Sequence, residues 1–467
     1  MLGLSELSNR IEEVRCLCQY KLWYDVPSFS EDEAVPHDVR QCYIFLDKTS
    51  RSFAAVVKTL PDQLREAVML FYLVLRGLDT IEDDMTLPLS KKVPLLKSFY
   101  EKIEEKGWNF QESGPNEKDR ELLLKFEIVI SEYLKLEEGF RTVIRDITKE
   151  MGEGMAHYVT LSEKNDGFSI NTIQDYDQYC HYVAGLVGIG LSRLFAESKL
   201  EDPEFAQAEA ISNSVGLFLQ KTNIIRDYRE DFDSNRHFWP REVWSKYANN
   251  FGEFCQPENS EKALSCLSEM TANALSHATD SLNYISSLQN QQVFDFVAIP
   301  QVMAIATLST VFRNPAVFQR NVKIRKGQAV QIVLHSVNIK NVCDLFLRYT
   351  REIHYKNTPK DPNFLKISIQ CGNIEQACET IFPRSYRELY EKVFSEKLFQ
   401  EKKGKTKEEA AKVAISDEAR RQYKKDMTDL GISVGIVLLV VFTCLAAIFY
   451  VLGISFSISD LKNLKLM

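Results

Sequence analysis

The sequence lacks the cysteine spacing of a zinc or redox site. Its ten cysteines are scattered, and the only close pair, Cys16 and Cys18, does not form a C-x-x-C motif. This pattern favours a reduced, cytosolic compartment.

The sequence also has no excess of positive charge. Its formal net charge is −8, its pI is near 5.6, and it has no long basic tract, whereas phosphate contacts with nucleic acid need a basic face. We therefore expect no nucleic-acid partner. We also expect no N-terminal signal peptide, because Glu6 and Arg10 interrupt any apolar run there.

One long stretch has no charge at all. The thirty residues between Asp429 and Asp460 are uncharged, and as a helix they would span about 45 Å, more than the ~30 Å core of a bilayer. The basic segment RRQYKK precedes them, so the positive-inside rule places the large N-terminal part in the cytosol. We predict a single-pass transmembrane tail anchor at 430–459, after a charged tether at 376–429. A buried core helix is the alternative.

Most of the remaining sequence predicts helices. Apolar residues recur at spacings of three and four, with few alternating β-branched runs. Pro61 is a favourable helix start. The apolar stripe that follows it consists of Leu64, Val68, Phe71, Leu75 and Leu78. Breaks rich in Gly, Pro, Asn and Asp occur at 107–119, 162–168 and 231–240, and we interpret them as loops of one bundle. The prediction is a single all-α domain over 1–375.

The stretch DTIEDD (79–84) crowds four carboxylates into six positions. A polar stripe at helical spacing runs into it and consists of Tyr72, Arg76, Asp79 and Asp83. Like charges one turn apart repel, and acids at a helix C-terminus oppose the macrodipole. A solvated helix end is the simple explanation, whereas a hard divalent cation such as Mg²⁺ would resolve the conflict.

A second acidic segment, QKTNIIRDYRED (220–231), has the same plan. Its helical stripe consists of Asn213, Gly216, Gln220, Asn223, Asp227 and Asp231. One such motif is weak support for a metal, but two favour a shared cavity between facing helices, where bundles build metal sites. With Mg²⁺ ions, the two patches would clamp a diphosphate leaving group.

Arginines near these motifs are candidates for the remaining phosphate oxygens. They are Arg51, Arg76 and Arg226. Each of them alone could instead be an ordinary ion-pair partner.

Several long segments together resemble the squalene synthase family. DTIEDD and DYRED occur with YCHYVAGLVGIGLSRLF between them and VFDFVAIPQVMAIATL and VKIRKGQA after them, and the similarity covers roughly residues 35–335 in the expected order. The resemblance implies a class I isoprenoid synthase fold and a requirement for Mg²⁺. It also implies a reaction that joins two farnesyl diphosphates head to head into presqualene diphosphate and reduces this with NADPH to squalene.

The resemblance further implies roles for individual residues. Mg²⁺ would be held by Asp79, Glu82, Asp83, Asp227 and Asp231, with Asp84 assisting. Catalytic roles would fall to Tyr179, Phe296, Arg76 and Tyr72. Tyr179 matches a tyrosine of the first half-reaction, where a phenol can transfer a proton or stabilise a cation. Phe296 matches an aromatic wall of the second, although packing in the core is the alternative role for both rings.

NADPH would bind without a Rossmann domain, because GLVGIG does not match G-x-G-x-x-G and sits within a predicted helix. The contacts implied by the resemblance are Lys323, Arg325 and Lys326, with contributions from Asn223 and the loop after Asp231. Taken as bare sequence, three basic residues in four more often form a solvated face.

Two further segments suggest how space is shaped around the substrates. Ala184, Gly188 and Ser192 leave a groove with little side chain, which could admit another helix or a prenyl chain. The charge-free residues 296–312 would form an apolar wall that keeps water from a carbocation, and Pro300 argues against a second membrane span there.

Two alternatives stay open. A phytoene or dehydrosqualene synthase would share both aspartate motifs without needing a reductant, and a catalytically inactive tail-anchored scaffold would keep only the fold. The segment VKIRKGQA and the predicted anchor favour the squalene synthase family. We expect a monomer on the cytosolic side of the endoplasmic reticulum membrane, where a soluble diphosphate enters and a hydrocarbon leaves into lipid.

Overall fold

The computed structural model describes residues 4–23, 27–164 and 168–384, with four single positions near the C-terminus, 428, 431, 432 and 435. At some helix ends, including Arg51, only the backbone is described. The predicted membrane helix at 430–459 and most of the tether at 376–429 lie outside these residues. Both therefore stay predictions.

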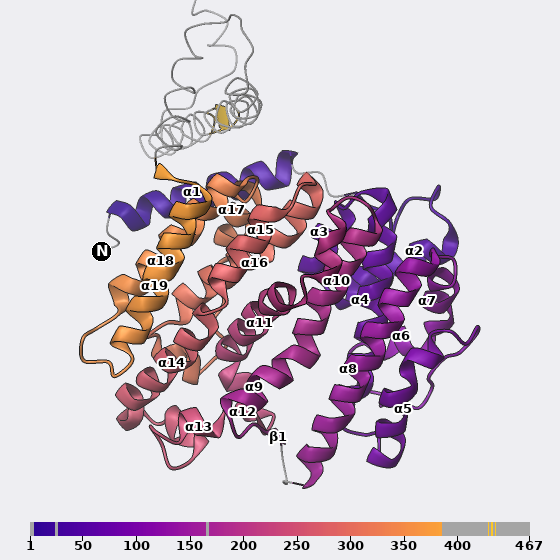
Figure 1. Cartoon of the computed structure of the whole chain (residues 1–467), viewed down its shortest axis with the longest axis horizontal. Coiled ribbons are helices and arrows are strands. Elements are labelled where there is room, and N and C mark those ends of the chain that lie inside the picture. Colours follow the sequence, from indigo (N-terminus) through magenta and orange to yellow (C-terminus); the bar gives the residue numbers. More distant parts are fainter. Residues whose placement is uncertain are drawn as a thin grey trace, which may run out of the picture. The chain divides into compact units, whose positions relative to one another are not determined.

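Residues Asp25–Pro383 form one compact unit, and Figure 1 shows that its described part is built almost wholly of helices, as the apolar spacing predicted. The first helices are α2 (His37–Thr49), α3 (Arg51–Lys58), α4 (Asp62–Asp83), α5 (Leu89–Lys102), α6 (Arg120–Leu124), α7 (Phe126–Tyr133), α8 (Glu138–Lys164) and α9 (Ile173–Cys180). A π-helical turn, η1 (His181–Gly185), then joins α9 to α10 (Leu186–Glu197).

The later helices of this unit are α11 (Glu209–Arg226), α12 (Tyr228–Asp233), α13 (Arg241–Trp244), α14 (Ser260–Leu275), α15 (Ala278–Ser287), α16 (Gln291–Val311), α17 (Lys326–His335), α18 (Ile339–Lys356) and α19 (Phe364–Ile381). Short 3-10 turns are η2 (Pro203–Gln207), η3 (Phe251–Cys255), η4 (Pro257–Asn259) and η5 (Pro315–Phe318). Helix α19 continues past position 375, where the tether was predicted to begin.

Helix α4 follows its sequence pattern closely. It begins after Pro61, and its whole apolar stripe is buried, with Leu64 and Leu78 both 0% exposed. It packs against α2, α5, α7 and α8. This burial fixes the direction in which its acidic C-terminal turn points.

Helix α16 is long and apolar enough to cross a membrane, but 78% of its apolar window is buried inside the fold. It packs against α11, α15, α17 and α18. It is therefore a core helix of this unit, as Pro300 suggested.

The groove of small residues on η1 and α10 is filled by α11. A side chain at Gly188 would meet the backbone oxygen of Ser212 at 2.2 Å, and one at Gly216 would meet that of Ala184 at 2.2 Å. The hydroxyl groups of Ser192 and Ser212 are 2.8 Å apart across the same contact. Of the two uses left open for this groove, helix packing is the one the structure has.

The spacing of the second acidic segment predicted one continuous helix. The structure divides this segment into two helices. Helix α11 ends at Arg226 and α12 begins at Tyr228, with Asp227 between them at φ −95° and ψ 12°. Tyr228 is buried among aromatic rings, with Trp239 and Phe251 at centroid distances of 5.1 and 4.8 Å. The amide of Asp231 still donates to the carbonyl of Asp227 at 3.0 Å, so the two aspartates stay one turn apart.

Two of the predicted loops pair with each other. Strand β1 (Phe168–Ser169) lies parallel to β2 (Arg236–His237), with Phe168 opposite Arg236. Within the described ranges this pair is the only sheet, so no Rossmann sheet occurs in that part of the chain. The pairing fixes the backbone of Arg236, whose side chain contacts both acidic motifs.

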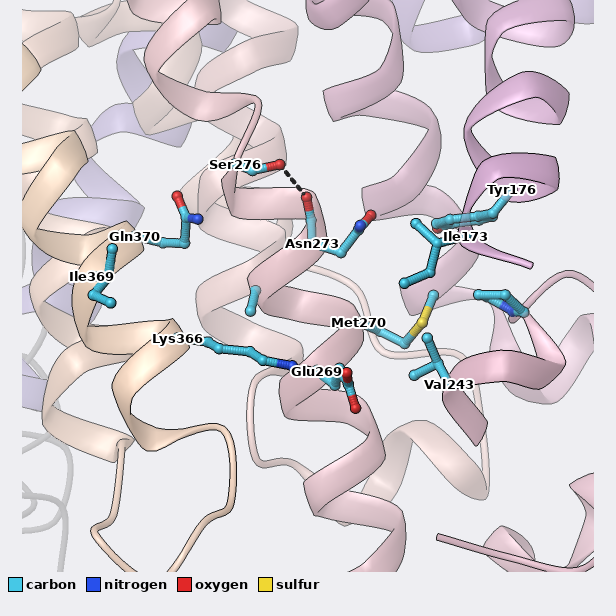
Figure 2. A pocket seen from close by; sticks show the side chains of 12 residues that line it. Ile173, Tyr176, Val243, Glu269, Met270, Asn273, Ser276, Lys366, Ile369 and Gln370 are labelled. Atoms are coloured by element: carbon cyan, nitrogen blue, oxygen red, sulfur yellow. Dashed lines mark hydrogen bonds and ion pairs between the residues drawn. The ribbon is translucent and has the colours of Figure 1, made fainter. Parts of the chain in front are cut away.

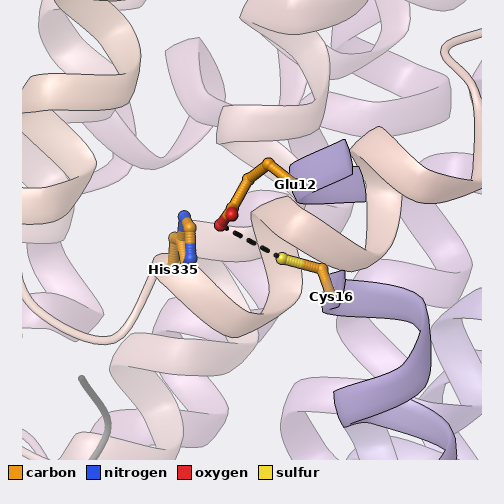
Figure 3. Close-up of side chains that lie close together, drawn as sticks. All are labelled: Glu12, Cys16 and His335. Carbon is orange, nitrogen blue, oxygen red and sulfur yellow. Dashed lines mark hydrogen bonds between the residues drawn. The ribbon is translucent and has the colours of Figure 1, made fainter. Parts of the chain in front are cut away.

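The smaller unit contains helix α1 (Leu4–Trp23). Within α1, the Cys16 thiol lies 3.7 Å from a carboxylate oxygen of Glu12, one turn before it (Figure 3).

Candidate active site

The first acidic motif occupies the last turn of α4. Asp79 and Asp83 lie one turn apart, and Nη1 of Arg76 is 3.6 Å from a carboxylate oxygen of Asp79. Arg76 is itself held in place, because its Nε donates a 2.7 Å hydrogen bond to the buried carboxylate of Asp119. Burial raises the pKa of Tyr72, one turn earlier on the same face.

The carboxyl groups of this motif resist ionisation. Burial raises the pKa of Asp79 to about 7, and repulsion by Asp83 adds to this against the opposing pull of Arg76. Burial raises the pKa of Glu82 to about 8, with repulsion by Asp83 and Asp79 adding to the shift. Oxygen ligands held together against their own repulsion are the donor set that a hard dication such as Mg²⁺ prefers, so these residues fit the metal.

Asp84, the last acid of the stretch, has a different role. It is 0% exposed, and its carboxylate accepts from the Gly114 amide at 2.7 Å and from the Thr86 amide at 2.8 Å. Burial alone would raise its pKa, but these hydrogen bonds lower it overall. Asp84 therefore holds the loop after α4.

The second acidic motif lies at the junction of α11 and α12. Asp227 accepts a 2.8 Å hydrogen bond from Nε of Arg226 and a 2.7 Å bond from Nδ2 of Asn321. Burial raises the pKa of Asp231 to about 7, and repulsion by Asp227 adds to the shift. This motif is therefore also short of positive charge.

Arg236 joins the two motifs. Its Nη1 lies 3.4 Å from Asp83 and its Nη2 lies 3.3 Å from Asp231, so one guanidinium touches a carboxylate of each. One aspartate of each pair therefore lies within reach of the same guanidinium. Arg236 lies in the predicted loop at 231–240, and no residue between Asp231 and the end of that loop was singled out from the sequence. The only signal was an arginine five residues after Asp231, which the strand pairing carries back to the acids.

Replacing Arg236 with glutamine should destabilise the metal-free protein by about 0.5–1 kcal/mol above pH 7, because two carboxylates lose a half-exposed partner. The pKa of Asp231 is raised to about 7 in the fold. Below that pH its carboxyl is protonated and no longer needs a cation, so the loss should fade as pH falls through 7. Thermal unfolding in a chelating buffer at pH 8 and pH 5.5 measures this.

Arg229→Gln is the matched control for this prediction. Arg229 pairs with Asp233 within α12, where both side chains are partly exposed. Its loss should have a small effect that is the same at both pH values. An equal pH response of the two variants would contradict the bridging role of Arg236.

Tyr179 lies beside the first motif. It is 8% exposed on α9, and its ring packs against Tyr158 and Phe238 at centroid distances of 5.1 and 5.3 Å. Burial raises its pKa well above the usual value, and the negative charges of Glu82 and Asp83 contribute. Tyr179 is therefore a neutral phenol near the acids at physiological pH.

Phe296 and Tyr72 belong to one aromatic group. Phe296 is 2% exposed on α16, and its ring centroid lies 5.3 Å from that of Phe53 and 6.0 Å from that of Phe195. Phe53 in turn lies 5.3 Å from Tyr72. Phe53 was not singled out from the sequence, because a lone phenylalanine in an amphipathic helix carries no distinguishing signal.

The basic cluster VKIRKG begins next to the second motif. Nδ2 of Asn321 donates to Asp227 at 2.7 Å and to Glu230 at 2.9 Å, and Lys323 follows two residues later. The cluster is exposed and consists of Lys323, Arg325 and Lys326. The anchor at Asn321 thus ties the start of this segment to the acids.

Two other predicted site residues lie on neighbouring helices. Asn223 is half-buried on α11, and its carbonyl accepts from the Asp227 amide at 2.9 Å. Arg51 begins α3, but its side chain lies outside the described part of the chain, so its contact with phosphate stays a prediction.

Comparisons with known proteins place the chain among related enzymes. Residues 46–328 match the family model for squalene/phytoene synthases. The curated squalene synthase of Schizosaccharomyces pombe is 68% identical over 460 residues, which cover 98% of this chain and 99% of that protein. A probable squalene synthase of Neurospora crassa is 52% identical over 372 residues, 79% of this chain and 77% of that protein.

A solved structure agrees with these sequence matches. The complex structure of TcSQS with the ligand E5700 superposes with a TM-score of 0.71 and 40% sequence identity. The match covers 74% of this chain and 99% of that chain.

Proposed function

Because the chain belongs to the squalene/phytoene synthase family, as a farnesyl-diphosphate farnesyltransferase of the squalene synthase type, we propose how its residues divide the reaction. Two farnesyl diphosphates are joined to presqualene diphosphate in a Mg²⁺-dependent step. NADPH then serves as the reductant that yields squalene. The observation that carries this division is the link from Asp83 through Arg236 to Asp231, which supports a common site for the two diphosphates.

Metal binding falls to the carboxylates whose pKa is raised or which lie next to such groups. They are Asp79, Glu82, Asp83, Asp227 and Asp231. Bound Mg²⁺ supplies positive charge that makes diphosphate a better leaving group. The chain itself supplies Arg236, a cation that already spans both carboxylate pairs.

Arginines hold and orient the phosphate oxygens in this proposal. Arg76 is supported by Asp119 on one side and lies near Asp79 on the other, so its position is set before a substrate arrives. Arg226 is fixed on Asp227 in the same way. Arg51 would complete the set from α3. Pre-positioned guanidinium groups bind diphosphate without paying for reorganisation.

Tyr179 is the group that handles a proton or a cation in the first half-reaction. Its high pKa keeps the hydroxyl protonated. The hydroxyl can therefore donate a hydrogen bond to an oxygen of the departing diphosphate beside Glu82 and Asp83. Its ring face is available to a cation as well. The neighbouring Tyr158 and Phe238 rings restrict its rotation.

Phe296 and Tyr72 form the wall for the second half-reaction, together with Phe53. The rings of this group are tilted against one another, and aromatic π faces can stabilise a carbocation without forming an adduct. The buried apolar surface of α16 behind them excludes water, which would otherwise trap the cation as an alcohol.

In this proposal NADPH binds at the basic segment that starts from Asn321. Lys323, Arg325 and Lys326 are exposed donors for nucleotide phosphates, and Asn223 lies one turn before Asp227 on α11. NADPH supplies a hydride when bound. These residues would bind and orient it beside the second motif.

The membrane and cellular setting belong to the same proposal. The tail at 430–459 would anchor a monomer in the endoplasmic reticulum membrane with residues 1–375 in the cytosol. Such a position would pass a hydrocarbon product directly into lipid.

Product analysis tests the proposed function. The full-length chain is incubated with farnesyl diphosphate and Mg²⁺, with and without NADPH, and the extracted products are identified. Squalene only with NADPH and presqualene diphosphate without it are expected. Dehydrosqualene irrespective of NADPH would assign the chain to the non-reducing branch, and no consumption by folded protein would favour a scaffold.

A further inference from the structure

A pocket of about 320 Å³ lies apart from every residue of the candidate active site. Figure 2 shows it between α9, α13, α14 and α19. Its apolar wall is made by Ile173, Val243, Met270 and Ile369. A volume of this size is at the small end of the ~300–1,000 Å³ range of ligand pockets.

Two residues that line this pocket each carry a buried polar atom with no hydrogen-bond partner among the residues that the structure describes. These atoms are the hydroxyl oxygen of Tyr176 and Oδ1 of Asn273. Tyr176 is only 1% exposed, and in Figure 2 its side chain reaches toward Asn273 from across the pocket. Leaving such atoms unpaired costs free energy, so natural proteins rarely bury them without a reason.

The carboxylate of the pocket is already paired with two ammonium groups. The carboxylate of Glu269 accepts from Nζ of Lys366 at 2.9 Å, from Nζ of Lys246 at 2.8 Å and from the Tyr247 hydroxyl at 2.8 Å. Glu269 and Lys366 are the charged members of the lining, and they lie together at one side of it (Figure 2). A cationic ligand would therefore find no unpaired carboxylate among the residues that line the pocket.

We propose that this pocket is a binding site for a small neutral alcohol with an apolar body. A hydroxyl group accepts from the Tyr176 O–H and donates to Oδ1 of Asn273 at once, which satisfies both unpaired atoms. The apolar body of the ligand lies against Met270 and Val243. An alkene or alkane leaves both polar atoms unpaired, and a carboxylate or phosphate meets an acceptor at Asn273.

The pocket and the proposed active site share one helix. Ile173 and Tyr176 of α9 line it, and Tyr179 lies one turn further along the same helix. The pocket argument itself rests on the unpaired atoms and does not depend on the reaction. Only the probe is chosen from the proposed substrate.

Farnesol is the probe, and calorimetric titration of the purified full-length chain is the measurement. Farnesene, which has the same apolar chain without the hydroxyl, is the matched ligand control. Farnesol should bind, and Tyr176→Phe should weaken it by about tenfold, the loss of one hydrogen bond. Asn273→Leu should weaken farnesol binding to a similar degree. Farnesene should bind to the wild type no more tightly than farnesol binds to either variant.

Tyr284→Phe is the matched protein control. Tyr284 is also buried, but its hydroxyl lies 2.6 Å from that of Ser192 and outside the pocket. This variant should unfold at a lower temperature and bind farnesol as the wild type does, whereas Tyr176→Phe should be at least as stable as the wild type. No binding of farnesol, or equal binding by the wild type and Tyr176→Phe, would overturn the proposal. So would equal binding of farnesol and farnesene by the wild type.

Discussion

Asp79→Asn is expected to lower the rate of presqualene diphosphate formation by about a thousandfold. Charge neutralisation by a metal contributes several kcal/mol to a transition state, and each 1.36 kcal/mol is tenfold in rate, so a loss of about 4 kcal/mol gives this factor. A neutral amide is a poor substitute for a carboxylate ligand of Mg²⁺. Asp227→Asn should act alike on the other side of Arg236. Single-turnover product formation at saturating farnesyl diphosphate measures both.

The Asp79 variant should lose activity without losing the fold. Burial and repulsion raise the pKa of Asp79 from 3.8 to about 7, so the ionised carboxylate destabilises the metal-free fold above pH 7. Asparagine removes this charge, and the variant should therefore unfold at the same or a higher temperature at pH 8. Its advantage should shrink as pH falls through 7, where the wild-type carboxyl takes up a proton.

A neighbouring acid outside the proposed clamp serves as the control. Asp233 is more than half exposed and pairs with Arg229, so Asp233→Asn should keep nearly full activity. Full turnover by Asp79→Asn, or an equal loss in Asp233→Asn, would rule out the division of roles proposed for these carboxylates.

Tyr179→Phe is expected to lower the same half-reaction by about 10²–10³-fold, the usual contribution of a positioned proton-transfer group. The ring and its packing on Tyr158 and Phe238 are kept in this variant, so binding of farnesyl diphosphate should change little. The high pKa of Tyr179 also predicts that the wild-type rate shows no titration of a tyrosine between pH 6 and 9.

Tyr158→Phe separates the hydroxyl of Tyr179 from general aromatic packing. Tyr158 touches Tyr179 edge to face, and its hydroxyl donates to the carbonyl of Asp175 at 3.1 Å. Its loss should slow the reaction less than tenfold. If Tyr179→Phe stays within a few-fold of the wild type while Tyr179→Leu is inactive, the ring and not the hydroxyl carries the role.

The sequence allowed the fold to be predicted where burial repeats with a helical period. The stripe from Leu64 to Leu78 is an example, because all of its residues are buried and the spacing that reveals this burial lies within one helix. The two acidic motifs were also visible, since repulsion between neighbouring carboxylates is a local property of the chain. Local patterns of this kind need no knowledge of the tertiary structure.

Arg236 and the break at Asp227 could not be predicted in the same way. Arg236 reaches Asp83 only because β1 and β2 pair across 68 positions of sequence, from Phe168 to Arg236. The break depends on the aromatic surroundings of Tyr228, which come from segments as distant as Phe318. Both features arise from contacts between remote parts of the chain, and no periodicity reports them.

The π-helical turn η1 has a consequence for the spacing of this segment. Each residue of an α-helix rotates the chain by about 100°, and a π-turn accommodates one residue more than the regular repeat. Gly188 packs α10 closely against α11. The rotation of α9 about its own axis therefore depends on the extra residue of η1. A homologous chain one residue shorter between 181 and 185 would turn its counterpart of Tyr179 away from the acids, although the tyrosine would still be present in its sequence.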